Sequence, residues 1–140
     1  MTQSVVSFVV PAHNEEPLLA ATLQAIHDSA AACGIEYEII VADDASTDRT
    51  THVAADLGAR VVSVQHRQIS ATRNSGARAA SGDVLVFVDA DTAINIDVLR
   101  RALDFVAGGA VGGGAALRFD GRIPFYARVL LPALTAMMRW

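Results

Sequence analysis

Acidic side chains gather in three short segments of this sequence, and each segment follows a run of apolar residues. They are Glu15 after the first run, Asp43, Asp44 and Asp48 after the second, and Asp89 and Asp91 after the last. Carboxylates brought to one place repel one another unless a positive group lies among them. Asp89 and Asp91 are two residues apart, so in an extended segment their side chains point the same way. Oxygen ligands at this spacing suit Mg²⁺ or Mn²⁺, with coordination positions left open for a diphosphate.

The apolar runs alternate with amphipathic segments, which predicts strands that alternate with helices. The predicted strands are 5–10, 37–42, 60–64 and 84–88, and the predicted helices are 16–33, 46–57, 69–80 and one that begins after residue 95. This order indicates an α/β fold, a three-layer α/β/α sandwich with a mainly parallel sheet. Ligands of such sheets bind beyond the carboxyl ends of the strands. The segments to consider are therefore 11–15, 43–48, 66–73 and 89–92.

Single residues mark the expected limits of these elements. We expect the first strand to end at Pro11, Ser46 to cap the second helix, and Asn95 to cap the last one. In the last helix we expect an apolar stripe formed by Leu99, Leu103 and Val106. His13 is expected to form a polar wall of the first loop.

The composition fits one domain of 140 residues. Its 11 basic residues, all Arg, stand against 15 acidic ones and give a net charge of −4, which argues against a general nucleic-acid binder. Cys33 is the single cysteine, so no internal disulfide can form, and a reducing compartment such as the cytoplasm is favoured. Neither a secretory signal nor a membrane-spanning run is evident in the sequence.

Four motifs in order resemble the N-terminal half of a family 2 glycosyltransferase with the GT-A fold, over roughly residues 4–107. They read V-V-P-A-H-N-E-E, I-I-V-A-D-D-A-S-T-D-R-T, A-T-R-N-S-G-A-R-A-A-S-G-D and F-V-D-A-D-T. The resemblance implies a hexosyltransferase, of the inverting type, that uses a nucleoside diphosphate sugar. It also implies Mg²⁺ or Mn²⁺ as cofactor, and uridine as the expected base.

The resemblance also implies roles for single residues. Pro11, Ala12, Asn14 and Glu15 would line the nucleotide pocket, and Asp44, with Asp43 beside it, would accept a hydrogen bond from the base. Arg73 would lie near the diphosphate or the base. Asp89, with Ala90 next to it, would contact the ribose or a metal-bound water, and Asp91 would hold the metal.

One part of the family pattern is missing from the sequence. Members need a general base that takes the proton of the acceptor hydroxyl. Three acidic residues follow the last motif, Asp97, Asp104 and Asp120, and none of them matches a base motif. We therefore name no catalytic residue, and we expect the general base to lie beyond Trp140, in an acceptor-side region of a longer protein.

The missing base suggests how the chain is organised. We expect residues 1–117 to form the donor-binding region, and 118–140 to begin an acceptor-side region or an interfacial helix in a truncated chain. This last segment suggests contact with the inner face of a membrane or self-association. The acceptor could be a glycan, a lipid-linked molecule or a protein.

Alternatives remain open at two levels. The whole chain could be a non-catalytic nucleotide-sugar-binding module or, less in keeping with its first loop, a sugar-phosphate nucleotidyltransferase. At single positions, Asp43, Asp44 and Asp48 could cap a helix, and Asp89 and Asp91 could form a turn.

Overall fold

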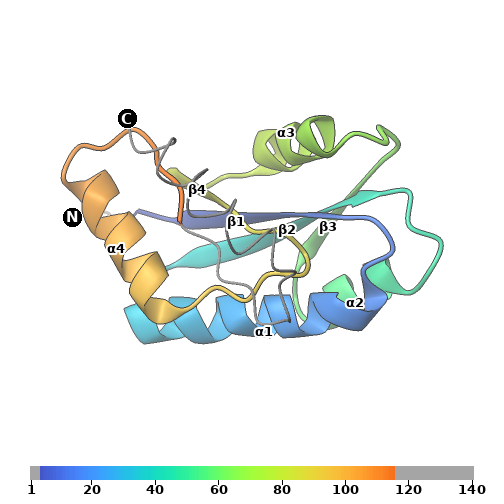
Figure 1. The fold of residues 1–140 in the computed structure, drawn as a ribbon, viewed down its shortest axis with the longest axis horizontal. Coiled ribbons are helices and arrows are strands. Elements are labelled where there is room, and N and C mark those ends of the chain that lie inside the picture. Colours follow the sequence, from blue (N-terminus) through green and yellow to red (C-terminus); the bar gives the residue numbers. More distant parts are fainter. Residues whose placement is uncertain (1–3, 116–140) are drawn as a thin grey trace, which may run out of the picture.

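The computed structural model describes residues 4–115, which form four strands and four helices in strict alternation. They are β1 (Val6–Ala12), α1 (Glu16–Cys33), β2 (Tyr37–Asp44), α2 (Thr50–Asp56), β3 (Arg60–Val64), α3 (Ile69–Ala79), β4 (Val84–Phe87) and α4 (Ile96–Ala107). All strands are parallel, in the order β3-β2-β1-β4 (Figure 1). The predicted α/β class and the parallel sheet are confirmed.

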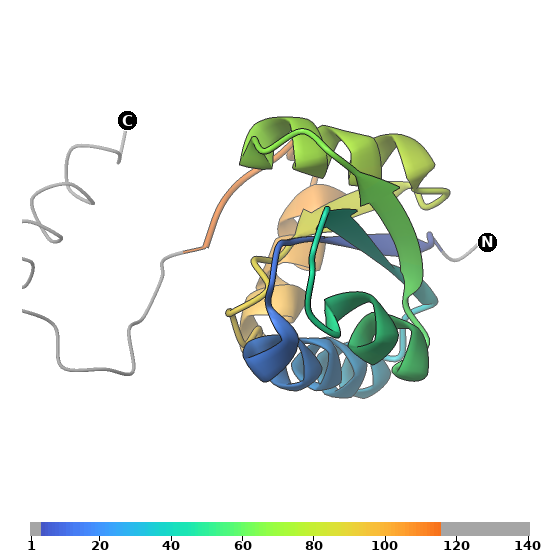
Figure 2. The same cartoon turned by 90° about the vertical axis from the view of Figure 1, so that its right-hand side faces the viewer.

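Helices cover both faces of the sheet, which makes three layers. Helix α3 lies on one face, and α1, α2 and α4 lie on the other (Figures 1 and 2). Alternate residues of β1 serve the two layers: Phe8 and Val10 join the core cluster under α1, together with Leu23 of that helix. Val9, between them, faces α3 on the other side of the sheet, next to Gly76 of that helix.

The first strand continues through Pro11, which corrects the expectation that it ends there. Pro11 pairs in register with Ala42 of β2. The Val9 carbonyl accepts a hydrogen bond from Val88 at 3.1 Å, so residue 9 faces β4, and residue 11 faces the same side. Strand β4 ends at Phe87, opposite Val9. The missing N–H of the proline therefore costs no ladder hydrogen bond.

Helix α2 begins at Thr50, four residues later than expected, and Ser46 is not its cap. The Ser46 hydroxyl instead accepts a hydrogen bond from the backbone N–H of Asn14 at 2.8 Å. Asp48 takes over the capping role, since its Oδ1 accepts from the N–H and the hydroxyl of Thr50 at 3.0 and 2.5 Å.

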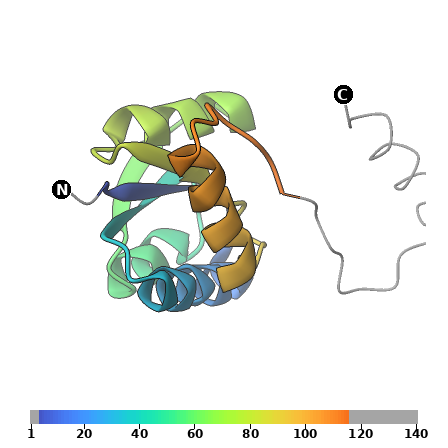
Figure 3. The same ribbon diagram turned by 90° about the vertical axis from the view of Figure 1, so that its left-hand side faces the viewer.

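Helix α4 packs beside α1 (Figure 3). Its predicted cap is confirmed, because the Asn95 side chain accepts from the N–H of Val98 at 3.0 Å. Along the predicted stripe, Leu99 is fully buried, Leu103 is half-buried and Val106 is 38% exposed. Phe105 and Val106, near the end of the helix, are both exposed among residues 4–115.

Residues 118–140, where we expect an acceptor-side region or an interfacial helix, lie outside the described residues. The general base expected beyond Trp140 therefore stays a prediction. Within residues 4–115 no helix has both the length and the apolar character needed to cross a membrane.

Candidate functional site

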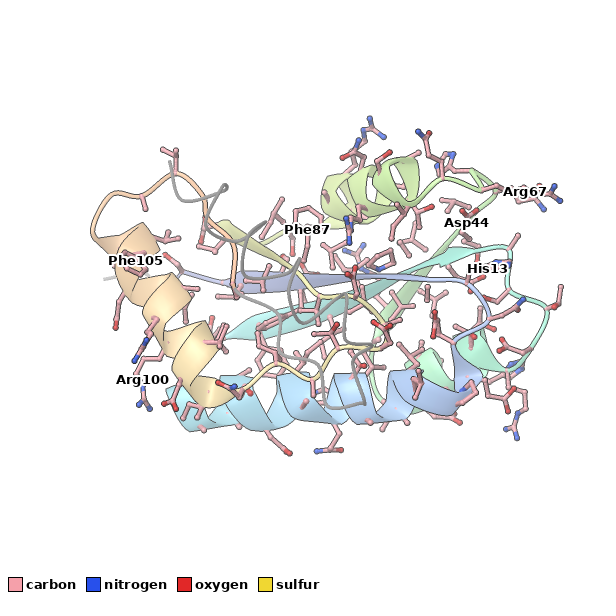
Figure 4. All side chains as sticks on the ribbon, viewed as in Figure 1. His13, Asp44, Arg67, Phe87, Arg100 and Phe105 are labelled. Atoms are coloured by element: carbon pink, nitrogen blue, oxygen red, sulfur yellow. The ribbon has the colours of Figure 1, made fainter. Side chains whose placement is uncertain are left out.

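A cavity of about 530 Å³ opens where β1 and β2 end. It is lined by Pro11, Ala12, His13, Glu15, Asp44, Arg67, Gln68, Ile69 and Thr72. These residues come from the ends of β1 and β2, the loop after β3 and the first turn of α3. Figure 4 shows His13, Asp44 and Arg67 at the same end of the molecule, far from Arg100 and Phe105 of α4. The cavity thus lies at the carboxyl edge of the sheet, where parallel sheets bind ligands.

Asp44 is the acidic centre of this cavity and is 7% exposed. Its Oδ1 accepts from the N–H of His66 at 2.7 Å, and its Oδ2 accepts from the hydroxyl of Thr72 at 3.0 Å. Burial by itself would raise the pKa of Asp44, but hydrogen bonds from the backbone of Arg67 and His66 and from Thr72 outweigh it, so the pKa is lowered from 3.8. The carboxylate is therefore ionised at neutral pH.

Left-handed backbone follows each of the first three strands. Asn14 has φ 54°, Ala45 has φ 57° and Arg67 has φ 51°. At Arg67 this conformation turns neighbouring backbone N–H groups toward one anion, here the carboxylate of Asp44. Such backbone costs free energy in residues other than glycine, and it persists because the surrounding hydrogen bonds fix it.

His13 is held in one tautomer by a chain of hydrogen bonds. Its Nδ1 lies 2.6 Å from the Asp44 carbonyl oxygen, which can only accept, so Nδ1 carries the proton. Asn14 accepts from the N–H of Thr47 at 2.8 Å through Oδ1, and its Nδ2 lies 3.4 Å from Nε2 of His13. His13 is thus a rigid, polar part of the cavity wall, as expected.

The loops after β1 and β2 cap each other. The N–H groups of Glu15 and Glu16 donate to Thr50 Oγ1 at 2.9 Å and to Asp48 Oδ2 at 3.2 Å. In return Glu16 Oε2 accepts from the N–H of Arg49 at 3.0 Å. The hydrogen bond from Thr50 is the largest of the effects that lower the pKa of Asp48. Asp48 thus satisfies the first N–H of α2 through its side chain, as the capping alternative expected, although the N-cap residue itself is Arg49.

Asp43 lies on the other face of the sheet from Asp44. Side chains alternate along β2, so Asp43 shares the α1 face with Val41. Its Oδ2 accepts from the N–H of Ser46 at 3.2 Å, while its buried Oδ1 has no hydrogen-bond partner among the described residues. The side chains of the two neighbouring aspartates therefore leave the strand on opposite faces of the sheet.

The segment after β4 is a turn and not extended, which corrects the expected geometry of the two aspartates. The N–H of Thr92 donates to the carbonyl of Asp89 at 3.0 Å. Ala90 is buried, and its carbonyl accepts from Thr22 of α1 at 2.7 Å, which anchors the turn. The turn alternative is right about the backbone, and it leaves both carboxylates exposed: Asp89 at its side chain and Asp91 as a whole.

Arg73 of α3 forms an ion pair with Asp89 through Nη2 and Oδ1. The Nε of Arg73 is buried and has no hydrogen-bond partner among residues 4–115. Within the same residues, the Asp91 carboxylate accepts only from the hydroxyl of Thr92 beside it, at 3.4 Å. Arg73 and Asp89 thus form a second polar pair, one residue along α3 from the cavity-lining Thr72, and Asp91 follows Asp89 in the same turn.

The residues of this turn fit a divalent cation as a partial ligand set. Within the described residues no three carboxylate, His or Cys side chains come together to hold a metal. Asp89 and Asp91 offer two accessible carboxylates, which is what Mg²⁺ takes from a protein when phosphate and water supply its other ligands.

The structure brings together part of the predicted site. Pro11, Ala12, Glu15 and Asp44 line the cavity, Arg73 pairs with Asp89 in the turn after β4, and Asp91 lies exposed in that same turn. Asn14, Asp43 and Ala90 are instead engaged in the supporting loops and core. The sequence did not single out Arg67, Gln68, Ile69 or Thr72, although the strand-end rule pointed to 66–73.

Known proteins resemble this chain in sequence. A dolichol-phosphate mannosyltransferase of Pyrococcus furiosus is 29% identical over 134 residues, which is 89% of this chain and 38% of that protein. A 4,4'-diaponeurosporenoate glycosyltransferase of Staphylococcus haemolyticus is 35% identical over 109 residues, which is 73% of this chain and 28% of that protein. The chain thus spans well under half the length of these relatives.

A comparison with solved structures and one with protein families point to the same group of proteins. The mannosyltransferase PcManGT from Pyrobaculum calidifontis, solved in complex with GDP-Man and Mn²⁺, has a TM-score of 0.64 and 27% identity, over 76% of this chain and 33% of that one. The family described as Glycosyl transferase family 2 matches residues 7–133. The chain therefore belongs to glycosyl transferase family 2 and has the GT-A fold.

Proposed function

We propose that this chain carries the donor site of an inverting glycosyltransferase that uses a nucleoside diphosphate sugar with Mg²⁺ or Mn²⁺. The observation that carries the proposal is the pairing of two features at one sheet edge. An ionised, buried Asp44 lines a cavity of nucleotide-compatible size, and two exposed carboxylates follow β4, one of them paired with Arg73 of α3. PcManGT, with its GDP-Man and Mn²⁺, supports the ligand class.

The base would be recognised by Asp44. An ionised carboxylate accepts hydrogen bonds and cannot donate them. Uracil presents an N3–H donor, whereas cytosine presents an unprotonated N3 at the same position. Pro11 and Ile69 supply apolar wall to the same cavity. We therefore expect UDP to bind more tightly than CDP.

Asp91 and Asp89 would hold the cation against the diphosphate. When bound, the cation offsets the negative charge that grows on the leaving nucleoside diphosphate. Arg73 would add a fixed positive charge on the same side. Asp91 is the freer of the two carboxylates, because Asp89 is paired with Arg73.

Calorimetric titration of the chain with UDP and GDP, each with Mn²⁺ and with EDTA, tests the donor site. We expect metal-dependent binding, which Asp91→Asn should weaken by about tenfold or more because it removes a charged ligand. Asp104→Asn, an exposed carboxylate of α4, is the matched control and should bind as the wild type does. Equal affinity of the Asp91 variant and the wild type would contradict the metal role.

Base recognition is tested by the ratio of the UDP and CDP dissociation constants. In Asp44→Asn this preference for UDP should fall about tenfold, since a hydrogen bond to a charged group is lost. A uniform loss for both nucleotides would argue that Asp44 only supports the cavity wall. Circular dichroism of the variant checks that the fold is kept.

A binding module without transfer is the second candidate. Asp97 and Asp104 lie exposed on α4 and do not line the cavity, and Asp120 lies outside the described residues. Binding without sugar release to any glycan, lipid-linked or protein acceptor would support this candidate, and transfer would refute it. Two further expectations stay predictions: that the protein is located in the cytoplasm or at the inner face of the membrane, and that it associates with itself.

A further inference from the structure

Asp89 has a positive partner already built into the protein. The Arg73 guanidinium, on α3, reaches across to Oδ1 of Asp89 in the turn after β4. The pair is accessible, with 35% of the Arg73 side chain and 45% of the Asp89 side chain exposed. Asp91, two residues on, has no such partner among the described residues, and its carboxylate accepts a hydrogen bond only from its neighbour Thr92.

A guanidinium and a divalent cation compete for the same carboxylate. Arginine stays charged at every working pH, so loss of a proton cannot release the carboxylate from the ion pair. A cation bound at Asp89 would lie close to this fixed positive charge, and the two would repel each other. Before a nucleotide binds, a cation therefore finds the Asp91 carboxylate without an ion-pair partner among the described residues and the Asp89 carboxylate already paired with Arg73.

A diphosphate changes this balance. Its oxygens are acceptors that a guanidinium binds in a forked geometry at least as well as a carboxylate. The Nε of Arg73 is buried without a hydrogen-bond partner in residues 4–115, so part of the fork has nothing to donate to. A bound diphosphate would offer Arg73 new partners and release Asp89.

We propose that Arg73 is a positioning residue that occupies Asp89 until a nucleoside diphosphate arrives, and so makes cation binding depend on the nucleotide. This inference rests on the proposed donor site. When the diphosphate enters, Arg73 moves its hydrogen bonds from Asp89 to phosphate oxygens, and both Asp89 and Asp91 become available to the cation. Nucleotide and cation then strengthen each other's binding by the same factor, as linkage requires.

Removing the arginine should therefore change two affinities in opposite directions: that for Mn²⁺ alone and that for UDP with Mn²⁺. Arg73→Gln should bind Mn²⁺ alone about fivefold or more tightly than the wild type, because Asp89 is freed. The same variant should bind UDP with Mn²⁺ more weakly. The factor by which UDP tightens Mn²⁺ binding should therefore shrink. Loss of a merely structural residue would not improve binding of the metal alone.

Titration of the 140-residue chain with Mn²⁺, followed by the electron paramagnetic resonance of the free ion, measures these affinities with and without UDP. Arg78→Gln is the matched control, since it removes the same charge from an exposed position on the same helix. Arg73→Lys keeps the charge and should restore weak binding of Mn²⁺ alone. The double variant with Asp89→Asn should lose the gain.

Each outcome decides a separate point. Arg73→Gln that binds Mn²⁺ no better than the wild type or Arg78→Gln would overturn the inference, and so would an absence of Mn²⁺ binding by Arg73→Gln. A wild type that binds neither UDP nor GDP with Mn²⁺ would contradict the proposed function, whatever the metal titration of the variant shows.

Discussion

At the scale of the residue, Glu38 of β2 joins three parts of the fold away from the cavity. Its Oε1 accepts from the hydroxyl of Ser7 at 2.6 Å and from the N–H and hydroxyl of Ser81 at 2.6 and 2.8 Å. Its Oε2 pairs with Arg60 at 3.3 Å. Burial alone would raise the pKa of Glu38, but the hydrogen bonds from Ser7 and Ser81 outweigh it and lower the pKa to about 2.

This depressed pKa predicts a pH dependence of stability. Because the folded pKa lies below the ordinary 4.5, the contribution of Glu38 is present above pH 4.5 and is lost as the pH falls toward 2. At pH 7, Glu38→Gln should lower the free energy of unfolding by roughly 1.5–3 kcal/mol, the range for hydrogen bonds to a charged group. Urea unfolding of the variant and the wild type at pH 7 and near pH 2 measures the difference in the free energy of unfolding.

The difference between the variant and the wild type should narrow near pH 2, where the folded-state carboxyl of Glu38 gains its proton. Glu36→Gln, an exposed residue two positions away, is the control and should be close to neutral at both pH values. A destabilisation by Glu38→Gln that is unchanged at low pH would show that packing and not ionisation is responsible.

At the scale of the element, helix α3 approaches the sheet more closely than a side chain allows. A Cβ placed on Gly76 would lie 2.5 Å from Val9 Cγ1 of β1 and 3.3 Å from the Cβ of Ala42 of β2. Val9 and Ala42 are fully buried, so neither can move aside freely. Gly76 therefore sets how near α3, and with it Thr72 and Arg73, comes to the strand ends.

Gly76→Ala should lower the free energy of unfolding by about 1–3 kcal/mol, as overpacking in a dense core does. It should also weaken nucleotide binding, because α3 moves outward with its cavity-lining first turn. Thermal unfolding and UDP titration check the two effects. Gly112→Ala is the control, since a Cβ there meets nothing within 4 Å. A fully stable Gly76 variant would contradict the close packing.

At the scale of the whole molecule, the site joins segments that are far apart in the chain. The cavity draws on β1, β2 and α3 and on the loops after β1 and β3, and the Arg73–Asp89 pair joins α3 to the turn after β4. A ligand that spans both would tie the strand ends together and bind only the folded chain. Ligand and stability are then linked by mass action.

This linkage predicts a shift in thermal unfolding. UDP with Mn²⁺ at about 100 times its dissociation constant should add about 2.7 kcal/mol to the free energy of unfolding and raise the melting temperature. EDTA should cancel the shift. In Asp91→Asn the same concentrations should give a much smaller shift, and an equal one would contradict the metal-dependent site.

The sequence by itself determined the order of elements, the parallel sheet and, to within about two residues, where the strands end; β1 continues through Pro11 to Ala12, and β2 continues to Asp44. Apolar runs and helical periodicity are local, so they place Asp44, Asp89 and Asp91 at one edge without knowledge of contacts. The tertiary structure alone decided which side chains work together. Alternation along β2 sends Asp43 and Asp44 to opposite faces, the reciprocal loops displace Ser46 from its predicted cap, and the packing of α3 brings Arg73 onto Asp89. These outcomes depend on partners far apart in the chain, which no local pattern records.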